Sequence, residues 1–262
     1  MRVLFSSSFL FIYVIICAQN PLRAQDQNLL QLFMPTTSTD CNEIIDYNFY
    51  SVSFCENFGL SEWAIYILNT NQLDSRIPRT NDFRPDPNLH KRGVGATMAD
   101  YKGSGFDRGH LVPAADMKYG AEAMSESFYL TNIVPQYPAF NRGDNKRHEN
   151  MFRDWAWQSN ERSIIVIVGW NTNDNFTDFL KGGNIPVPKN FYRIYIDYVN
   201  FRTIAFYTPH SGRNFIKDKN ELISYTISTD SLETITGLDF FHKLSDEEEM
   251  LLELDTGRKK PH

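Results

Sequence analysis

Runs of β-branched and aromatic residues recur along the chain and predict strands. The longer runs are Glu62–Leu68, Ser163–Val168, Phe191–Asp197, Phe201–Thr208 and Ile223–Thr229. The run at 163–168 is almost entirely apolar and is followed by Gly169, which predicts a central strand buried on both faces. Only three residues separate the runs at 191–197 and 201–208, which therefore predict an antiparallel hairpin.

A helix is predicted over Asp144–Asn160, where apolar and aromatic positions recur at steps of three and four residues. The preceding Asn141–Asp144 segment supplies residue types that cap a helix N-terminus. A shorter helix is predicted over Leu232–Ile235, ending at Gly237.

Two shorter apolar segments lie between the first long strand and the long helix. His110–Val112 predicts a short strand that Pro113 ends. Ser127–Val134 predicts either another strand or a buried turn before Pro135. Residues 71–97 contain three prolines and several charges, and predict an ordered, winding loop.

The order of these elements predicts an α+β fold. Strands and helices do not alternate regularly, so we expect a mainly antiparallel central sheet with helices. With 42% hydrophobic and 14% aromatic residues, the chain can form a sizeable core. No repeat or linker divides it, so one domain is expected over residues 25–262. Its core would span about residues 60–245, followed by an acidic C-terminal extension.

Residues 1–24 are typical of a secretory signal peptide. Met1-Arg2 gives a positive start, an apolar run extends to Ala18, and no acidic residue precedes Asp26. The run is shorter than the roughly 20 residues of a membrane-spanning helix. Cleavage is expected after Ala18 or Ala24, although a lipoprotein cleaved before Cys17 is an alternative that the bulky preceding isoleucine disfavours. We therefore expect a secreted or periplasmic protein with no stable membrane span after signal removal.

Outside the expected signal peptide, the chain has two cysteines, Cys41 and Cys55. An even count in an exported chain favours a disulfide between them, and two buried thiols that never meet are the alternative.

The net charge argues against broad electrostatic wrapping of nucleic acid. It is −6 for the whole chain, and loss of Arg2 and Arg23 with the signal peptide would make it about −8. A local basic groove is still expected, because cations gather before and within one motif: Arg76, Arg79, Arg84, Lys91, Arg92, Lys102 and Arg108. The acidic residues at 246–249 and 253 lie at the far end of the chain, on an expected solvated helix.

The tetrapeptide Asp107-Arg108-Gly109-His110 is the main candidate for chemistry. A neutral imidazole with an ordinary pKa of about 6.5 can take a proton from water, so His110 is a candidate general base. In an extended segment Arg108 lies on the same face, and its guanidinium matches two phosphate oxygens. Gly109 permits a close approach by backbone or ligand. Arg108 could instead form an ion pair with Asp107, which could itself orient a metal-bound water or hold the loop.

A second group of polar residues follows this tetrapeptide. Asn132 and Asn141 lie on the two sides of a Pro-Gln turn, and Glu149 follows two helical turns later. An amide oxygen is a hard ligand that Mg²⁺ accepts, and Mg²⁺ keeps most of its waters. One direct protein ligand, with a carboxylate that reaches the water shell, is therefore a reasonable site. Taken singly, Asn141 could be a helix cap and Glu149 a solvated carboxylate.

Together these motifs resemble the DNA/RNA non-specific endonucleases of the ββα-metal class, which include secreted bacterial nucleases and mitochondrial endonuclease G. The matching pieces are Asp-Arg-Gly-His at 107–110, Thr-Asn-Ile-Val-Pro-Gln at 131–136, Phe140-Asn141, and Glu149. The similarity extends over about residues 66–244. It implies a ββα-metal active-site motif and a metal-dependent phosphodiester hydrolase.

The resemblance implies a role for each matched residue. His110 would be the general base, and Asn141 the direct ligand of Mg²⁺, with Mn²⁺ as an alternative ion. Glu149 would act through the waters of the ion. Arg108 and Asn132 would support the phosphate and the charge of the transition state.

Two departures from the family pattern affect the expected groove. The family often places an arginine upstream that contacts phosphate, and here Arg79 and Arg84 are both candidates. Gly169-Trp170 stands where Gly-Pro is common, which is expected to reshape the groove wall.

The expected function is exported, metal-dependent endonucleolytic cleavage of DNA and RNA with little sequence or sugar specificity. His110 would deprotonate a water opposite the leaving 3′ oxygen, so the product would carry a 5′-phosphate. Two alternatives stay open: a catalytically silent, exported nucleic-acid-binding protein, or a metal-dependent phosphodiesterase that acts on a small or lipid-linked substrate.

Overall fold

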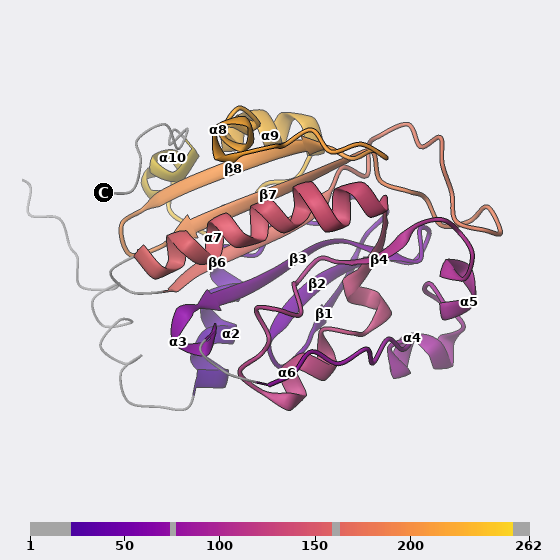
Figure 1. Cartoon of the computed structure of the whole chain (residues 1–262). Coiled ribbons are helices and arrows are strands. Elements are labelled where there is room, and N and C mark those ends of the chain that lie inside the picture. Colours follow the sequence, from indigo (N-terminus) through magenta and orange to yellow (C-terminus); the bar gives the residue numbers. More distant parts are fainter. Residues whose placement is uncertain (1–21, 74–76, 159–162, 254–262) are drawn as a thin grey trace, which may run out of the picture.

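A seven-stranded antiparallel sheet forms the centre of the structure (Figure 1). The computed structural model describes residues 22–73, 77–158 and 163–253. Across the sheet the strands follow the order β1 (Glu43–Asp46), β2 (Tyr50–Cys55), β3 (Leu60–Asn69), β6 (Ser163–Trp170), β7 (Asn190–Asp197), β8 (Arg202–Pro209) and β9 (Thr226–Ile227). With its helices, this sheet confirms the expected α+β fold.

Helices pack on both faces of this sheet. The helical elements are α2 (Leu22–Phe33), α3 (Thr70–Leu73), α4 (Pro87–Arg92), α5 (Met98–Tyr101), α6 (Ala121–Glu126), η1 (Leu130–Asn132), η2 (Phe140–Asn145), α7 (Lys146–Gln158), α8 (Lys219–Ile223), α9 (Thr229–Thr236) and α10 (Asp246–Glu253). None of the described helices is long and apolar enough to cross a membrane.

Strand β6 lies in the middle of the sheet and is buried along its whole length, as expected. Its alternate side chains enter two different hydrophobic clusters, because successive residues of a strand point to opposite faces. Ile164 and Val166 pack in the cluster that includes side chains of α7. Ile165 and Ile167 pack in the cluster that includes side chains of α2, α9 and α10. The sheet is therefore covered on both sides.

The C-terminal elements confirm one prediction and correct another. Strands β7 and β8 pair as the expected antiparallel hairpin. The predicted strand at 223–229 is wrong except for the two residues of β9. Asp218 and Ser228 each accept backbone N–H groups with their side chains, so helices begin at Lys219 and Thr229 and leave little room for a strand. Helix α9 ends as expected at Gly237, whose left-handed φ of 72° suits glycine.

A second, two-stranded sheet carries the tetrapeptide at 107–110. Strand β4 (Asp107–His110) pairs antiparallel with β5 (Ile133–Gln136), and η2 and α7 follow in the chain. This is the expected ββα arrangement. The strand predicted at 110–112 begins three residues earlier, because the partner strand β5 pairs with 107–110. The segment before β5 is the short helical turn η1, which corresponds to the buried-turn alternative.

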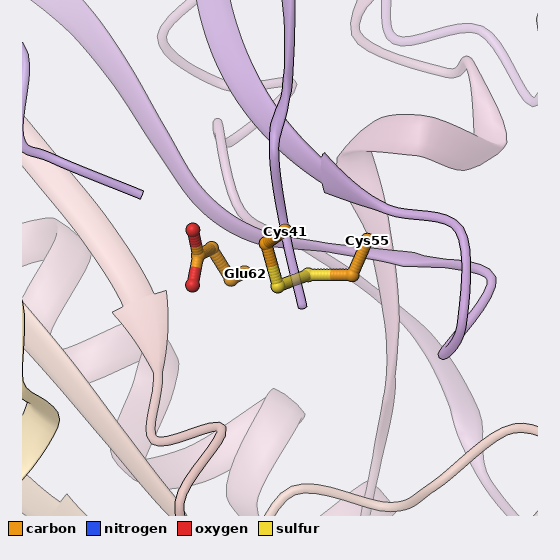
Figure 2. A group of neighbouring side chains, drawn as sticks. All are labelled: Cys41, Cys55 and Glu62. Atoms are coloured by element: carbon orange, nitrogen blue, oxygen red, sulfur yellow. A yellow bond between two sulfur atoms is a disulfide. The ribbon is translucent and has the colours of Figure 1, made fainter. Parts of the chain in front are cut away.

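The N-terminal part contains elements that the sequence did not predict. Strands β1 and β2 extend the sheet, and α2 packs against it. Helix α2 begins within the predicted signal peptide, of which residues 1–21 lie outside the described residues. The Cys41–Cys55 disulfide is present, and it joins the segment before β1 to the end of β2 (Figure 2).

Candidate active site

Arg108 and His110 lie on one face of β4, as expected for residues two apart in an extended segment. Both side chains contact the ring of Phe83. The Arg108 guanidinium carbon lies 4.1 Å from the ring centroid, and the His110 ring centroid lies 5.4 Å from it. Phe83 therefore holds a cation and an imidazole next to each other.

His110 is enclosed by aromatic side chains. Its ring packs edge-on against Phe128 at 4.9 Å, and the residue is only 7% exposed. Nε2 is buried and has no hydrogen-bond partner within the described residues. Burial, and then the positive charges of Arg79 and Arg108, lower the pKa of His110 to about 3. The imidazole is therefore neutral near pH 7, as a general base requires.

Gly109 allows a close approach by a side chain of the neighbouring strand. A Cβ at this position would lie 2.1 Å from the side-chain carbonyl carbon of Gln136. Gln136 is fully buried, and both polar atoms of its amide lack a partner in the described part of the chain. Buried amides are normally hydrogen-bonded, so this amide is a candidate to bind a group that enters the site.

Asp107 joins β4 to the segment that carries Asn141. Its Oδ2 accepts hydrogen bonds of 2.9 Å from Asn141 Nδ2 and Arg142 Nε, and its Oδ1 accepts one of 2.7 Å from Arg142. Burial alone would raise the pKa of Asp107, but the bonds from Arg142 and Asn141 outweigh it and hold the pKa below its usual value. Asp107 therefore stays ionised and holds the loop, one of the two roles considered from the sequence.

Asn141 is not the helix cap that the sequence suggested. The helical path begins at Pro138, passes through the π-helical segment η2 and continues into α7. Asn141 therefore lies inside the first turn, and its backbone N donates to Tyr137 O at 2.9 Å. Its side-chain nitrogen bonds Asp107, while no donor within the described residues contacts Oδ1. The amide oxygen is thus available as a ligand.

Glu149 lies on the same helical run as Asn141, and two neighbours fix its carboxylate. Asn145 Nδ2 donates to Glu149 Oε1 at 3.1 Å, and Arg153 Nη2 donates to Glu149 Oε2 at 3.4 Å. The side chain is 16% exposed. Burial raises the pKa of Glu149, and the positive charges of Arg153 and Arg193 oppose that rise.

Beyond Glu149, a buried polar network extends to the sheet. Arg153 Nε donates to Asp116 Oδ1 at 2.5 Å, and Tyr66 donates to the other oxygen at 2.8 Å. Arg193, a buried cation on β7, donates to Asn145. Sequence reasoning missed this network. Its one visible signal was Arg193, a charged residue within an otherwise apolar run.

Asn132 is fully buried, and its amide bonds backbone groups. Its Oδ1 accepts from Val112 N at 2.8 Å, and its Nδ2 donates to Val112 O and Ser127 O. These bonds hold the chain immediately after His110. The geometry therefore gives Asn132 a role in positioning β4, and its support of the phosphate and of the transition-state charge stays a prediction.

The two upstream arginines differ in their surroundings. Arg84 donates to Asp82 and to the backbone and side chain of Ser125, and it lies 4.2 Å over the Tyr129 ring. Arg79 is exposed and lies over the ring of Phe128, at 5.4 Å from its centroid, on the aromatic residue that also contacts His110. The structure thus brings Arg79, and not Arg84, toward the imidazole.

Trp170 lies in the hydrophobic core. It is buried at the end of β6, and its indole N–H donates to Ser61 O at 2.7 Å. The ring is therefore part of the core, and an effect of Gly169-Trp170 on the groove wall stays a prediction.

Two groups of potential metal ligands occur elsewhere among the described residues. Figure 2 shows Cys41, Cys55 and Glu62, but both sulfur atoms of that group are bonded to each other. The other group, Asp230, Glu233 and Glu253, is an acidic cluster at α9 and α10. Neither group belongs to the site at β4.

Comparisons with known proteins identify the family of this chain. Residues 30–247 match the family model of the DNA/RNA non-specific endonucleases. A nuclease of Nostoc sp. is 31% identical over 222 residues, which cover 80% of this chain and 77% of that protein. Mitochondrial nuclease EXOG of Xenopus laevis is 28% identical, over 86% of this chain and 64% of that protein.

A solved structure shares the fold. A chain in the crystal structure of the EndoG/EndoGI complex superposes with a TM-score of 0.73, covering 92% of this chain and 99% of its own length. Its sequence is 19% identical, so it supports the ββα-metal fold alone. From the family match and the Nostoc relative we conclude that this chain belongs to the DNA/RNA non-specific endonuclease family and is a nuclease.

Proposed function

We propose that this protein is an exported, divalent-metal-dependent endonuclease that cleaves DNA and RNA and leaves 5′-phosphates. The observation that carries the proposal is the composition of β4 and its contacts. This strand presents a neutral imidazole and a cation on one face, and at its other end Asp107 holds Asn141. We further propose that β4 and the residues that contact it belong to a single nuclease domain at residues 25–262.

The residues around Asn141 fit a divalent ion. The Asn141 amide oxygen is free of donors within the described residues, and Mg²⁺ and Mn²⁺ accept such hard oxygen ligands. Asn141 would hold the ion directly, and Glu149 would reach its water shell. The unpartnered Gln136 amide, which lies in register with Asp107, is a further polar group of this region. When bound, the ion supplies Lewis-acid stabilisation of charge on the phosphate and leaving oxygens.

His110 would accept a proton from the attacking water. Its Nε2 is buried, so Nδ1 is the nitrogen that we assign to this task. The low pKa keeps the imidazole in the accepting form. Attack opposite the 3′ oxygen leaves the phosphate on the 5′ side. Such general-base help contributes about 10² to 10⁴-fold to the rate.

Arg108 and Arg79 would bind the scissile phosphate and stabilise the charge that grows on it. Both lie close enough to His110 to lower its pKa. All of these contacts are to phosphate or metal and none is to a base, so sequence and sugar specificity should be weak. Asn132 would act indirectly, by holding the backbone after His110.

Export is supported by the apolar N-terminal sequence and by the Cys41–Cys55 disulfide, which is typical of oxidising compartments. Detection of the processed chain outside the cytoplasm, with its N-terminus sequenced, tests this part of the proposal. A chain retained in the cytoplasm with free thiols would contradict it.

The enzymatic part is tested with supercoiled plasmid and single-stranded RNA as substrates. We expect cleavage of both in Mg²⁺ or Mn²⁺, none in EDTA, and fragments that a ligase rejoins without prior phosphorylation. Circular dichroism in EDTA should show an intact fold. Failure on both polymers with added metal would favour a silent binding protein or a small-substrate phosphodiesterase.

A further inference from the structure

His210 is a buried histidine with no part in the chemistry described above. It follows the last residue of β8 and is 6% exposed. Its ring lies among three aromatic rings, with centroid distances of 4.9 Å to Tyr137, 4.7 Å to Phe140 and 5.1 Å to Phe191. Two of these neighbours belong to the segment that leads to Asn141.

The hydrogen bonds of the ring define its protonation. The backbone N of Tyr137 donates to Nε2 at 2.7 Å, so Nε2 carries no proton. Nδ1 lies 2.6 Å from the carbonyl oxygen of Pro188, which can only accept, so Nδ1 carries the proton. His210 is thus neutral, and its tautomer is fixed from both sides. Burial favours the same form by lowering the pKa of His210 to about 4.

A continuous series of hydrogen bonds leads from this ring to the proposed metal ligand. His210 fixes the N–H of Tyr137, and the carbonyl oxygen of Tyr137 accepts the N–H of Asn141 at 2.9 Å. The side chain of Asn141 then donates to Asp107 on β4. Each backbone group of Tyr137 therefore has one partner, and the two partners are His210 and Asn141.

The connection after His210 contacts the next turn of the same segment. Asp144 accepts the backbone N–H groups of Phe215 and Ile216 at 2.9 and 3.1 Å. A Cβ on Gly143 would lie 2.0 Å from the side-chain oxygen of Asn214, so the Asn214 side chain packs directly against the Gly143 backbone. Residues 210–216 thus contact the chain on both sides of Asn141, and His210 makes the contact that precedes it.

We propose that His210 is a positioning residue that sets the place of Asn141, and thereby the affinity of the site for its divalent ion. This inference rests on the proposed role of Asn141 as the metal ligand. The effect on metal affinity acts through the hydrogen bond between Nε2 and Tyr137 N. The Nδ1 bond joins the ring to Pro188, in the connection before β7, and does not involve the segment that carries Asn141.

Two substitutions separate the two bonds of the ring. His210→Gln places an amide oxygen near the position of Nε2, so it can accept from Tyr137. His210→Asn is shorter, so it retains a donor near Nδ1 but cannot reach Tyr137. Leu232→Ala, a fully buried position in the other cluster, controls for lost stability, and Asn141→Ala reports on the ligand itself.

The readout is Mn²⁺ binding to the folded protein without substrate, followed through the electron paramagnetic resonance signal of free Mn²⁺. We expect His210→Asn to weaken binding by about tenfold or more, the effect of one buried N–H left without a partner. His210→Gln and Leu232→Ala should bind within about twofold of the unsubstituted protein. In plasmid cleavage, His210→Asn should raise the Mg²⁺ concentration for half-maximal rate by the same factor and leave the saturated rate nearly unchanged.

The outcomes distinguish the inference from the proposed function. If Asn141→Ala weakens binding while His210→Asn does not, or if both His210 variants weaken it equally, the role of His210 is overturned and that of Asn141 stands. If Asn141→Ala binds Mn²⁺ normally, the ligand assignment fails and the positioning role fails with it.

Discussion

At the scale of single residues, the function of a cation here depends on what already contacts its charge. The guanidinium of Arg84 is held by Asp82 and Ser125, so it serves the fold. Arg79 is exposed and close enough to His110 to influence its pKa. An arginine that is to bind phosphate must have donors to spare, because the guanidinium fork uses two of them at once.

This difference gives a prediction for the two arginines. Arg79→Ala should lower kcat/KM on plasmid DNA by about 10-fold or more, the scale of one charge-assisted contact, with little change in Tm. Arg84→Ala should lower Tm, because it removes the bonds to Ser125 and the contact over Tyr129. Steady-state kinetics and thermal unfolding of both variants check this. A loss of activity in Arg84→Ala but not in Arg79→Ala would show that Arg84 makes the phosphate contact, and would contradict the prediction.

At the scale of elements, the β4–β5 ribbon depends on a glycine for packing. The φ of Gly109 is not left-handed. Glycine is therefore needed here because the Gln136 side chain lies over this position. Gly109→Ala should destabilise the fold by about 1–3 kcal/mol, the usual cost of overpacking. It should also reduce activity, because β4 carries His110.

The matched test is a double-mutant cycle. If the clash with Gln136 is the cause, Gln136→Ala added to Gly109→Ala should recover much of the free energy of unfolding measured in urea. Additive losses in the double variant would show that another contact makes alanine unacceptable at position 109.

The elements were predicted from the sequence unequally, for physical reasons. The apolar run of β6 and the hairpin β7–β8 carry their own pattern, so they were predicted well. β1 and β2 were missed, although the disulfide between Cys41 and Cys55 was anticipated. The strand predicted near 223–229 failed because two capping side chains favour helices on both sides.

The residues of the site were also predicted unequally from the sequence. His110, Arg108 and Asn141 were candidates from residue type and spacing, and their roles stay predictions. Phe83, Gln136 and Asn145 were not candidates, because their contacts come from segments whose approach depends on the tertiary fold. The backbone-bonding role of Asn132 also depends on the tertiary fold, since an amide side chain can bond a phosphate and a peptide group equally well.

At the scale of the whole molecule, the basic cluster expected from the sequence is partly neutralised in the fold. Arg92 pairs with Glu43 and Glu56, and Arg84 pairs with Asp82. The net charge of the chain is −6, so we expect nucleic acid to be held mainly by contacts at the site.

The buried histidines make the stability of the whole molecule depend on pH. Stability should fall as the pH drops below about 6.5. Above that value His110 and His210 are neutral in both the folded and the unfolded state, so they contribute nothing to the pH dependence of the free energy of unfolding. Below it the unfolded chain gains protons first, because the folded pKa values are about 3 and about 4. At pH 5 each histidine should then cost about 2 kcal/mol of folding free energy. Buried carboxyl groups with raised pKa values, such as Glu149, act in the opposite direction.

Comparison with a variant isolates the histidine contribution. Urea unfolding of the natural chain and of His210→Gln at pH 7, 6 and 5 should show a smaller loss in the variant, by about 2 kcal/mol at pH 5. Equal losses in the two proteins would mean that the pKa of His210 is the same in the folded and unfolded states.

The most direct test of the central claim is single-turnover plasmid cleavage in saturating Mg²⁺ by the unsubstituted protein and His110→Ala, with His90→Ala, an exposed histidine on α4, as the matched control. We predict that His110→Ala cleaves at least about 10²-fold more slowly while it binds Mn²⁺ with unchanged affinity, and that His90→Ala cleaves normally. Cleavage by His110→Ala at the rate of the unsubstituted protein would contradict the account.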